Sequence, residues 1–273
     1  SRGLGDVYKR QELPGEVFTT RTLATYSYEL NNKKAPFDNV NVRKALNLSL
    51  DRNVITDKVL GQGQTPTYVF TPTYIEEGQL IQQPAYSKEP MAQRNEEAIK
   101  LLEEAGYSKA NPLKFSILYN TNENHKKVAI AAASMWKANT KGLIDVKLEN
   151  QEWKTYIDSR RAGRYDAARA GWNADYNQAT TFGNYFLSNS SNNTAKYANP
   201  EYDKAIAESY VATDAEGRAK AYAKAEEILA KDFGIVPIFN YVNPRLVKPY
   251  VKGYSGKDPQ DHIYLRNLYI IKH

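Results

Sequence analysis

The sequence predicts an α/β fold in which a mixed sheet is covered by helices. Segments rich in β-branched and aromatic residues alternate with segments whose apolar residues recur at helical spacing. The 273 residues are 41% apolar and 25% charged, which is typical of a packed chain with one large or two ordinary domains. No run approaches the ~18 to 20 consecutive apolar residues of a membrane span.

Strand signals occur from near the start of the chain to its end. They consist of β-branched and aromatic residues, often alternating with polar ones, and are bounded by turn residues. The predicted strands are residues 25–30, 113–119, 144–148, 165–169, 235–241 and 264–271. Because extended segments flank a largely helical middle, we expect one domain to be inserted between two strands of another.

Helix signals fill the space between these strands. Two helices follow the first strand, and we expect Asp38 and Asp51 to cap them. The other predicted helices are residues 95–105, 125–139, 153–161, 201–211 and 215–231, the last capped by Asp214. Residues 61–90, rich in Gly, Pro, Thr and Gln, predict a loop that wraps the surface, and residues 171–181 predict a loop dense in polar and aromatic groups.

Composition and motifs argue against several classes of function. The chain has no cysteine and only three histidines, and it lacks H-E-x-x-H, G-x-S-x-G, Walker and G-x-G-x-x-G motifs, so we expect no enzyme, no metal site and no cofactor. The formal charge is +6, but Lys and Arg alternate with Asp and Glu along the chain, so we expect no nucleic-acid partner. The 21 tyrosines suit adaptable polar pockets, or half-buried positions in a large fold.

The segment ARAGWNADY (residues 168–176) is the strongest candidate for a binding site. It places Arg169, Trp172 and Asp175 around Gly171, directly after a predicted strand. A guanidinium, an aromatic surface and a carboxylate are the groups that a zwitterionic peptide requires. A surface salt bridge beside a core tryptophan would give the same pattern, so both interpretations stay open on these residues alone.

Several segments together carry a family resemblance. ARAGWNADY is joined in order by YELNN, VRKALNLSLDR, RNEEAIKLLEEAGY, LYNT, HKKVA, NQEWKT and YVNPRLVKP. In this set the chain resembles the periplasmic oligopeptide-binding proteins of Gram-negative bacteria, family 5 of the extracellular solute-binding proteins. The resemblance covers nearly everything after Gln11, and the closing run GYSGKDPQDHIYLRNLYIIKH fits the family's C-terminus.

The resemblance implies a periplasmic-binding-protein fold of type II and a division of this chain into parts. Residues 31–242 would form the complete distal peptide-binding lobe. Residues 12–30 and 243–273 would be strands that return to a base domain, and residues 1–11 would be a leader foreign to the family. The chain would correspond to the second half of a clamshell in which a peptide lies extended between two lobes.

The resemblance also assigns roles to individual residues. Asp175 would hold the peptide α-ammonium as a buried, desolvated pair, and Gly171 and Asn173 would pair with the peptide main chain. Arg169 and His125 would hold a peptide carboxylate, with Arg160 serving peptides of a different length. Four further positions would line the hinge and the side-chain pockets: Glu29, Trp153, Trp172 and Tyr241. Some relatives have Cys in place of Asn173 and Lys in place of Leu60, which bears on peptide length.

The function implied is that of a non-enzymatic receptor in the periplasm. Its partners would be short peptides and the membrane subunits of an ABC importer, and the full-length protein would be a monomer. A receptor of the same family for cell-wall peptides or another solute stays open as an alternative, and so, further off, does a hydrolase.

Overall fold

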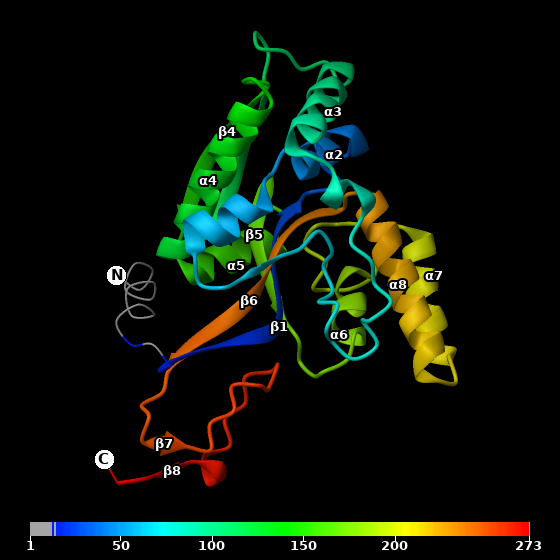
Figure 1. Cartoon of the computed structure of the whole chain (residues 1–273). Coiled ribbons are helices and arrows are strands. Elements are labelled where there is room, and N and C mark those ends of the chain that lie inside the picture. The colour runs from blue at the N-terminus through cyan, green and yellow to red at the C-terminus, as the bar shows by residue number, and fades with distance from the viewer. Residues whose placement is uncertain (1–12, 14, 273) are drawn as a thin grey trace.

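A six-stranded sheet forms the centre of the computed structural model, which describes residue 13 and residues 15–272. Helices cover both faces of this sheet (Figure 1). In spatial order the strands run β2-β6-β1-β5-β3-β4. Their bounds are β1 Val17–Leu30, β2 Thr65–Pro66, β3 Leu113–Asn120, β4 Ile144–Gln151, β5 Ala167–Asn173 and β6 Ile235–Leu246.

The sheet is mixed, as the sequence predicted. β3 pairs in parallel with β4 and β5, whereas β1 runs antiparallel to both β5 and β6. Parallel neighbours require a crossover connection, which α4 provides between β3 and β4. β1 and β6 are the two longest strands, and they extend together beyond the helical layers (Figure 1).

The seven predicted helices are present in the predicted order, with small shifts at their ends, and the structure adds the short helical segments η2, α6 and η3. In chain order these segments are α2 Val40–Leu48, η1 Val54–Leu60, η2 Ala85–Lys88, α3 Met91–Glu104, α4 Glu123–Asn139, α5 Trp153–Arg161, α6 Thr180–Gly183, η3 Asn184–Phe186, α7 Pro200–Val211 and α8 Ala215–Lys231. The segment η1 is a π-helix, and η2 and η3 are 3₁₀-helices. The long loop predicted for residues 61–90 is present, interrupted by β2 and η2.

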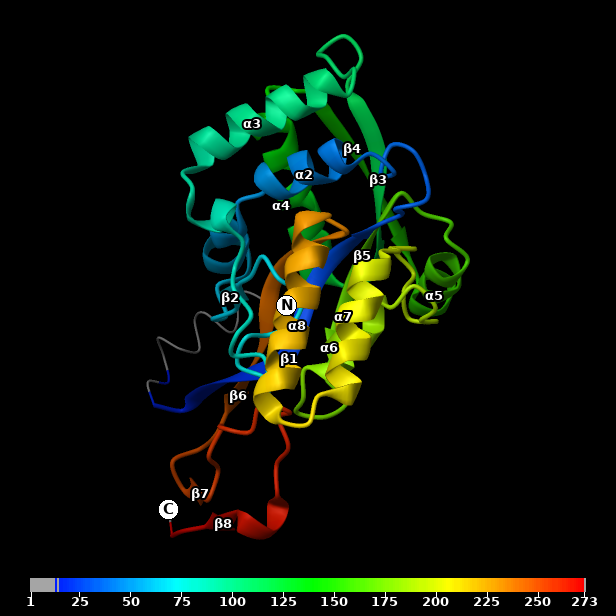
Figure 2. The same ribbon diagram turned by 90° about the vertical axis from the view of Figure 1, so that its right-hand side faces the viewer.

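Two hydrophobic cores lie on opposite faces of the sheet. α2, α3 and α4 pack on one face against Tyr26 and Tyr28, and α6, α7 and α8 pack on the other against Leu23 (Figure 2). Alternate residues of β1 therefore serve different cores, as the pleat of a strand requires. In the first core Trp136 is fully buried and donates from Nε1 to the Leu46 carbonyl at 2.9 Å, which satisfies its only polar atom.

The predicted caps are correct in two of three cases. The Asp214 carboxylate accepts from Gly217 N at 2.7 Å and begins α8, and the Asp51 carboxylate accepts from Asn53 N at 3.0 Å and Val54 N at 3.2 Å. The Asp38 prediction is wrong because the neighbouring Asn39 side chain accepts from Asn41 N at 2.9 Å and starts α2. Either residue type can cap a helix, so the sequence alone does not distinguish adjacent positions.

Several predicted strand bounds are also wrong: β1 begins at Val17 and not at residue 25, and β6 continues to Leu246 and does not end at residue 241. β5 does not end at Arg169 but continues to Asn173, because each residue from Ala167 to Asn173 pairs with β1. Gly171 to Asn173 are therefore strand residues, and the loop begins after them. Residues 264–271 do not form one strand: a 3₁₀ turn, η4 (Leu265–Asn267), precedes a two-residue strand, β8 (Tyr269–Ile270).

The C-terminal segment forms a small unit of its own beyond β6. β7 (Val251–Lys252) pairs antiparallel with β8, and Figure 1 shows this hairpin at the end of the molecule reached by β1 and β6. Gly253 has a φ of +85°, and a Cβ there would lie 1.8 Å from the Asn267 carbonyl oxygen. Only glycine fits this close approach. The proposed division into a lobe and base strands stays a prediction, and the predicted leader lies outside the described residues.

Candidate functional site

The site is built on β5, whose composition suits a strand buried between two layers. Ala167, Ala168 and Ala170 are almost completely buried, and their small side chains let helices approach both faces. Arg169 pairs in register with Tyr28 and therefore projects toward the face covered by α2, α3 and α4. Arg169 is thus the charged residue of a strand that otherwise consists of Ala, Gly, Trp and Asn.

One edge of β5 is open over most of its length. β3 pairs with β5 only at Ala167 and Ala168, while β1 pairs along the whole of the opposite edge. Ala174 N donates to the Leu23 carbonyl at 2.8 Å, so residue 174 directs its main chain toward β1. Because alternate residues of an antiparallel strand direct their main-chain groups to opposite edges, Asn173 and Gly171 present theirs to the open edge.

The guanidinium of Arg169 is held among aromatic rings without an acid. Its Nη2 donates to the Tyr241 hydroxyl, and its Cζ lies 5.1 Å from the Tyr26 ring centroid. Nε is buried with no hydrogen-bond partner in the described structure. The groups that act on its charge are the hydroxyls of tyrosines, and no carboxylate of the described residues forms an ion pair with it. A buried cation of this kind is suited to receive an anion.

Gly171 gives the guanidinium its space. A Cβ at this position would lie 2.9 Å from Arg169 Nη2 and 3.1 Å from the Tyr241 hydroxyl. Both groups are half-buried and bonded to each other, so a side chain at position 171 would displace them. The prediction that position 171 belongs to the site thus has a steric reason besides its open main chain.

His125 lies at the start of α4, behind the same aromatic cluster. Its ring centroid is 5.5 Å from that of Tyr26. Burial and, to a smaller extent, the Arg169 charge together lower the pKa of His125 from 6.5 to about 3. At neutral pH the imidazole is therefore uncharged and can donate a hydrogen bond from one nitrogen.

A cleft of about 590 Å³ opens beside the β5 edge. Five of the predicted residues line it: Trp153, Arg169, Gly171, Asn173 and Tyr241. Seven further residues line it that sequence reasoning missed: Thr22, Leu23, Ala174, Asn243, Pro259, Gln260 and Asp261. The last three belong to the segment D-P-Q-D. This motif predicts a turn but does not predict what the turn contacts.

Glu29 and Arg160 lie outside the cleft, in a network on the opposite face of the sheet. Arg160 Nη2 lies 2.9 Å from Glu29 Oε2, and their side chains are 11% and 0% exposed. Tyr185 donates to Glu29 Oε1 at 2.6 Å, and the Thr194 hydroxyl donates to Oε2. The Glu29 charge holds the pKa of Arg160 well above its ordinary value against the effect of burial. The peptide roles assigned to these two residues stay predictions.

Trp172 and Asp175 are placed apart from the guanidinium. Trp172 packs against Tyr185 in the second core, with ring centroids 4.9 Å apart, and its Nε1 lies 3.3 Å from the Thr181 hydroxyl. Asp175 is exposed, and its carboxylate accepts from the same hydroxyl at 3.4 Å. The buried pair that the resemblance implies for Asp175 with a bound ammonium stays a prediction.

Neither a metal-binding cluster nor a membrane-spanning helix occurs among the described residues. Among them no group of three or more His, Asp and Glu side chains is arranged to hold a metal ion. No helix in the described ranges has the length and apolar character needed to cross a membrane.

Comparison with known proteins identifies the family. Residues 3–194 match the model of the bacterial extracellular solute-binding proteins, family 5 Middle. The periplasmic oligopeptide-binding protein OppA of Haemophilus influenzae is 96% identical over 97% of this chain and 49% of that protein. The periplasmic murein peptide-binding protein MppA of Escherichia coli is 44% identical over 96% of this chain and 48% of its own length. The chain thus spans about half the length of these curated relatives.

Solved structures give the same answer for the fold. The crystal structure of H. influenzae OppA in complex with RPPGFSPFR superposes with a TM-score of 0.92 at 92% identity, and it covers 99% of this chain and 53% of that one. The unliganded open form of MppA superposes with a TM-score of 0.88 at 42% identity. The mixed sheet, its helical layers and the sequence agree with one family. This chain belongs to the family 5 bacterial extracellular solute-binding proteins, with the type II periplasmic-binding-protein fold.

Proposed function

We propose that this chain supplies one wall of the peptide-binding cleft of an extracytoplasmic receptor, which delivers short peptides to an ABC importer. The observation that carries the proposal is the open edge of β5 beside an arginine without an acid. An extended peptide added at this edge would bond to the main chain of Gly171 and Asn173, and such pairing does not depend on the peptide sequence.

The ends of the peptide would find opposite charges along the same wall. Arg169 and the neutral His125 would receive the carboxylate, and Asp175 would receive the α-ammonium. The cleft has room for hydrated side chains, which lets varied residues be accepted at little cost. Binding without turnover is the mode expected of a family 5 solute-binding protein.

Closure would complete the site. Asp175 is exposed here, so the second lobe of a clamshell would have to bury it around the bound ammonium. We therefore expect the chain alone to bind peptides far more weakly than the chain joined to the half that precedes it in its relatives. The receptor would act in the periplasm as a monomer, with the importer's membrane subunits as partners.

The chain is similar to both an oligopeptide-binding and a murein peptide-binding protein. For either kind of ligand we propose the same recognition of an extended peptide with free ends. A lysine-rich tripeptide and a murein tripeptide, titrated side by side, would decide which of the two is preferred. Equal failure of both would direct the search to another solute.

The assignment of Asp175 is tested with Asp175→Asn in the chain joined to its preceding half. A free-amino tripeptide should lose about 30-fold or more in affinity, as expected when one member of a buried charge pair is removed. The N-acetylated tripeptide should lose much less. Isothermal titration calorimetry measures both, and an equal loss for the two peptides would remove Asp175 from this role.

A further inference from the structure

A turn from the C-terminal segment lies against the cleft, and none of the predicted roles uses it. We call residues 256–261 the strap. Its sequence G-K-D-P-Q-D encodes a turn, with Asp at the first position and Pro at the second. Asp261 N donates to the Asp258 carbonyl at 2.9 Å, and Gln260 N donates to the Asp258 carboxylate at 2.8 Å. The strap is thus a locally defined unit.

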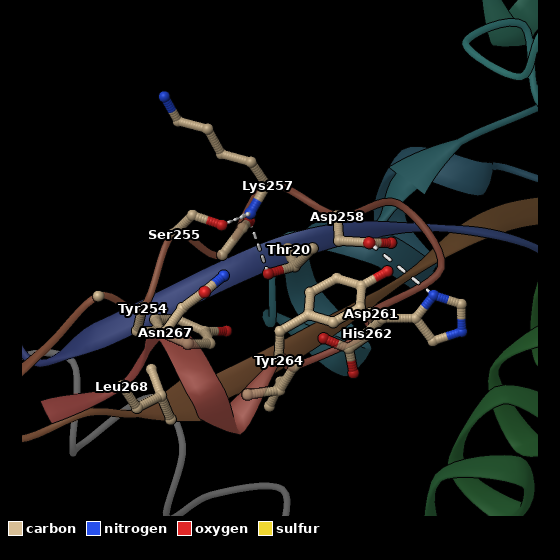
Figure 3. A pocket seen from close by; sticks show the side chains of 13 residues that line it. Thr20, Tyr254, Ser255, Lys257, Asp258, Asp261, His262, Tyr264, Asn267 and Leu268 are labelled. Atoms are coloured by element: carbon tan, nitrogen blue, oxygen red, sulfur yellow. Dashed lines mark hydrogen bonds and ion pairs between the residues drawn. The ribbon is translucent and has the colours of Figure 1, made fainter.

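The strap crosses β1 at an irregular point. Between Arg21 and Thr25 the pairing of β1 with β6 shifts register, and three residues of β1 stand opposite the single residue Tyr241. Such a bulge leaves main-chain groups without their strand partner. Here Leu23 N donates to the Pro259 carbonyl of the strap at 2.8 Å. The Thr20 hydroxyl, labelled in Figure 3, donates to the Gly256 carbonyl at 2.8 Å.

Asp261 attaches the strap to β6 on the other side of the bulge. Its carboxylate forms a bidentate ion pair with Arg245, and it accepts from Asn243 Nδ2 at 2.7 Å. The Asp261 side chain is only 13% exposed, whereas that of Arg245 is 37% exposed. Asp261 has a φ of +59°, a conformation that Asp and Asn tolerate better than most residues. Asp261 is therefore the residue on which the position of the strap depends.

From this anchored position the strap reaches the candidate ligand site. Pro259, Gln260 and Asp261 line the cleft together with Arg169 and Gly171. Gln260 Nε2 lies 3.4 Å from the main-chain oxygen of Asp175, so the strap contacts the loop that carries the proposed ammonium anchor. The strap also bonds to Leu23, and the Leu23 carbonyl in turn accepts from Ala174 N, where that loop leaves β5.

We propose that the strap positions the Asp175 loop against β5 and so determines how strongly the receptor discriminates free from blocked peptide N-termini, with Asp261 as the positioning residue. This inference rests on the proposed peptide-binding function. The strap forms part of the cleft wall, and its ion pair sets the place of the loop that receives the α-ammonium.

The test uses Asp261→Asn and Gln260→Ala in the chain joined to its preceding half. Asparagine keeps the backbone conformation of position 261 and removes the charge, and Gln260→Ala removes a single contact to the Asp175 loop. Two quantities are measured: the hydrogen-exchange protection of the Leu23 amide, and the ratio of dissociation constants for an N-acetylated and a free-amino lysine-rich tripeptide. Matched controls are Glu16→Gln, which breaks the exposed Lys248 ion pair, and Gln82→Ala, which removes a similar contact to a main-chain oxygen.

We expect Asp261→Asn to lower Leu23 protection and to reduce the discrimination ratio by about fivefold or more, the lower end of typical coupling between sites. Gln260→Ala should reduce the ratio while it leaves Leu23 protected, and both controls should match the unsubstituted protein. Unchanged discrimination in both strap variants would overturn the inference, as would full Leu23 protection in Asp261→Asn. If Asp175→Asn itself leaves the ratio unchanged, the ammonium assignment fails instead, and the strap has no anchor to position.

Discussion

Two arginines on opposite faces of one sheet have contrasting surroundings. Arg160 bonds to Glu29, and that carboxylate also accepts from Tyr185 and Thr194. Arg169 faces the other core among tyrosines, with one hydroxyl as its hydrogen-bond partner. The first charge is neutralised inside the protein, and the second is not.

The difference separates two kinds of energetic role. A buried ion pair with further hydrogen bonds is self-sufficient, and a ligand that used Arg160 would have to compete with Glu29 for it. A guanidinium at the cleft without an acid is free to pair with a bound carboxylate, and that pair would stabilise the liganded protein. The family resemblance assigned both arginines to a peptide carboxylate, whereas the structure distinguishes their surroundings.

The largest effect is expected from Glu29→Gln, which should leave Arg160 as an unpaired buried charge. We expect the free energy of unfolding to fall by about 3 to 5 kcal/mol, the usual cost of breaking a buried pair. Urea denaturation followed by circular dichroism would measure it. Glu216→Gln is the matched control, because its ion pair with Lys220 is exposed and should contribute little. Equal stability of the two variants would mean that the pair does not hold this face together.

Local signals were sufficient to predict most of the helices. α5 and α8 occupy the predicted residues because their apolar spacing and, for α8, the Asp214 cap lie within the segment itself. The extension of β5 to Asn173 was missed because it depends on pairing with β1, whose residues are distant in the sequence. Long-range pairing of this kind leaves no local pattern.

The candidate site was predicted only in part, because contacts between residues distant in the sequence leave no local pattern. Arg169 and Gly171 stand in one distinctive segment, so the family resemblance located them directly, and both line the cleft. The pairing of Arg160 with Glu29 joins side chains 131 positions apart, and no spacing rule connects them. The strap residues Gln260 and Asp261 were predicted only as part of a returning segment, because a turn motif does not say what the turn will contact.

The second effect concerns Arg169→Met, which should behave in the opposite way to Glu29→Gln. No internal ion pair is lost, so we expect the free energy of unfolding to stay within about 1 kcal/mol of the original or to rise. Binding should suffer instead, with about 30-fold or greater loss of affinity for free-carboxylate peptides whose end reaches Arg169.

Peptide length provides the control for this variant. Peptides of two to five residues are compared in a displacement assay, since those whose carboxylate lies elsewhere should be spared. A C-terminally amidated peptide of the affected length should lose little. Uniform weakening at every length, or a large loss of stability, would show that Arg169 supports the fold and does not receive the carboxylate.

The smallest expected effect is a pH dependence of stability and peptide affinity, caused by His125 beside Arg169. Because the pKa of His125 is lowered to about 3, the folded protein binds its proton less readily than the unfolded chain does. The stability that the folded protein gains from keeping His125 neutral is fully present above the ordinary pKa of about 6.5 and is lost as the pH falls toward 3. A bound carboxylate would raise the pKa of His125, so the liganded protein should take up a proton more readily than the free one.

Peptide affinity should therefore increase as the pH is lowered from 7 to 4, by at most about tenfold per pH unit, the limit for one proton. Below that range the peptide carboxylate itself becomes protonated, at a pKa of about 3.5. His125→Gln keeps a hydrogen-bond donor and removes the titration, so it should abolish the slope while His262 and His273 remain as an internal background. Calorimetry in two buffers of different ionisation enthalpy measures the proton uptake directly. The same slope in both proteins would exclude His125 from the carboxylate end of the cleft, and the guanidinium of Arg169 would then receive the ligand without it.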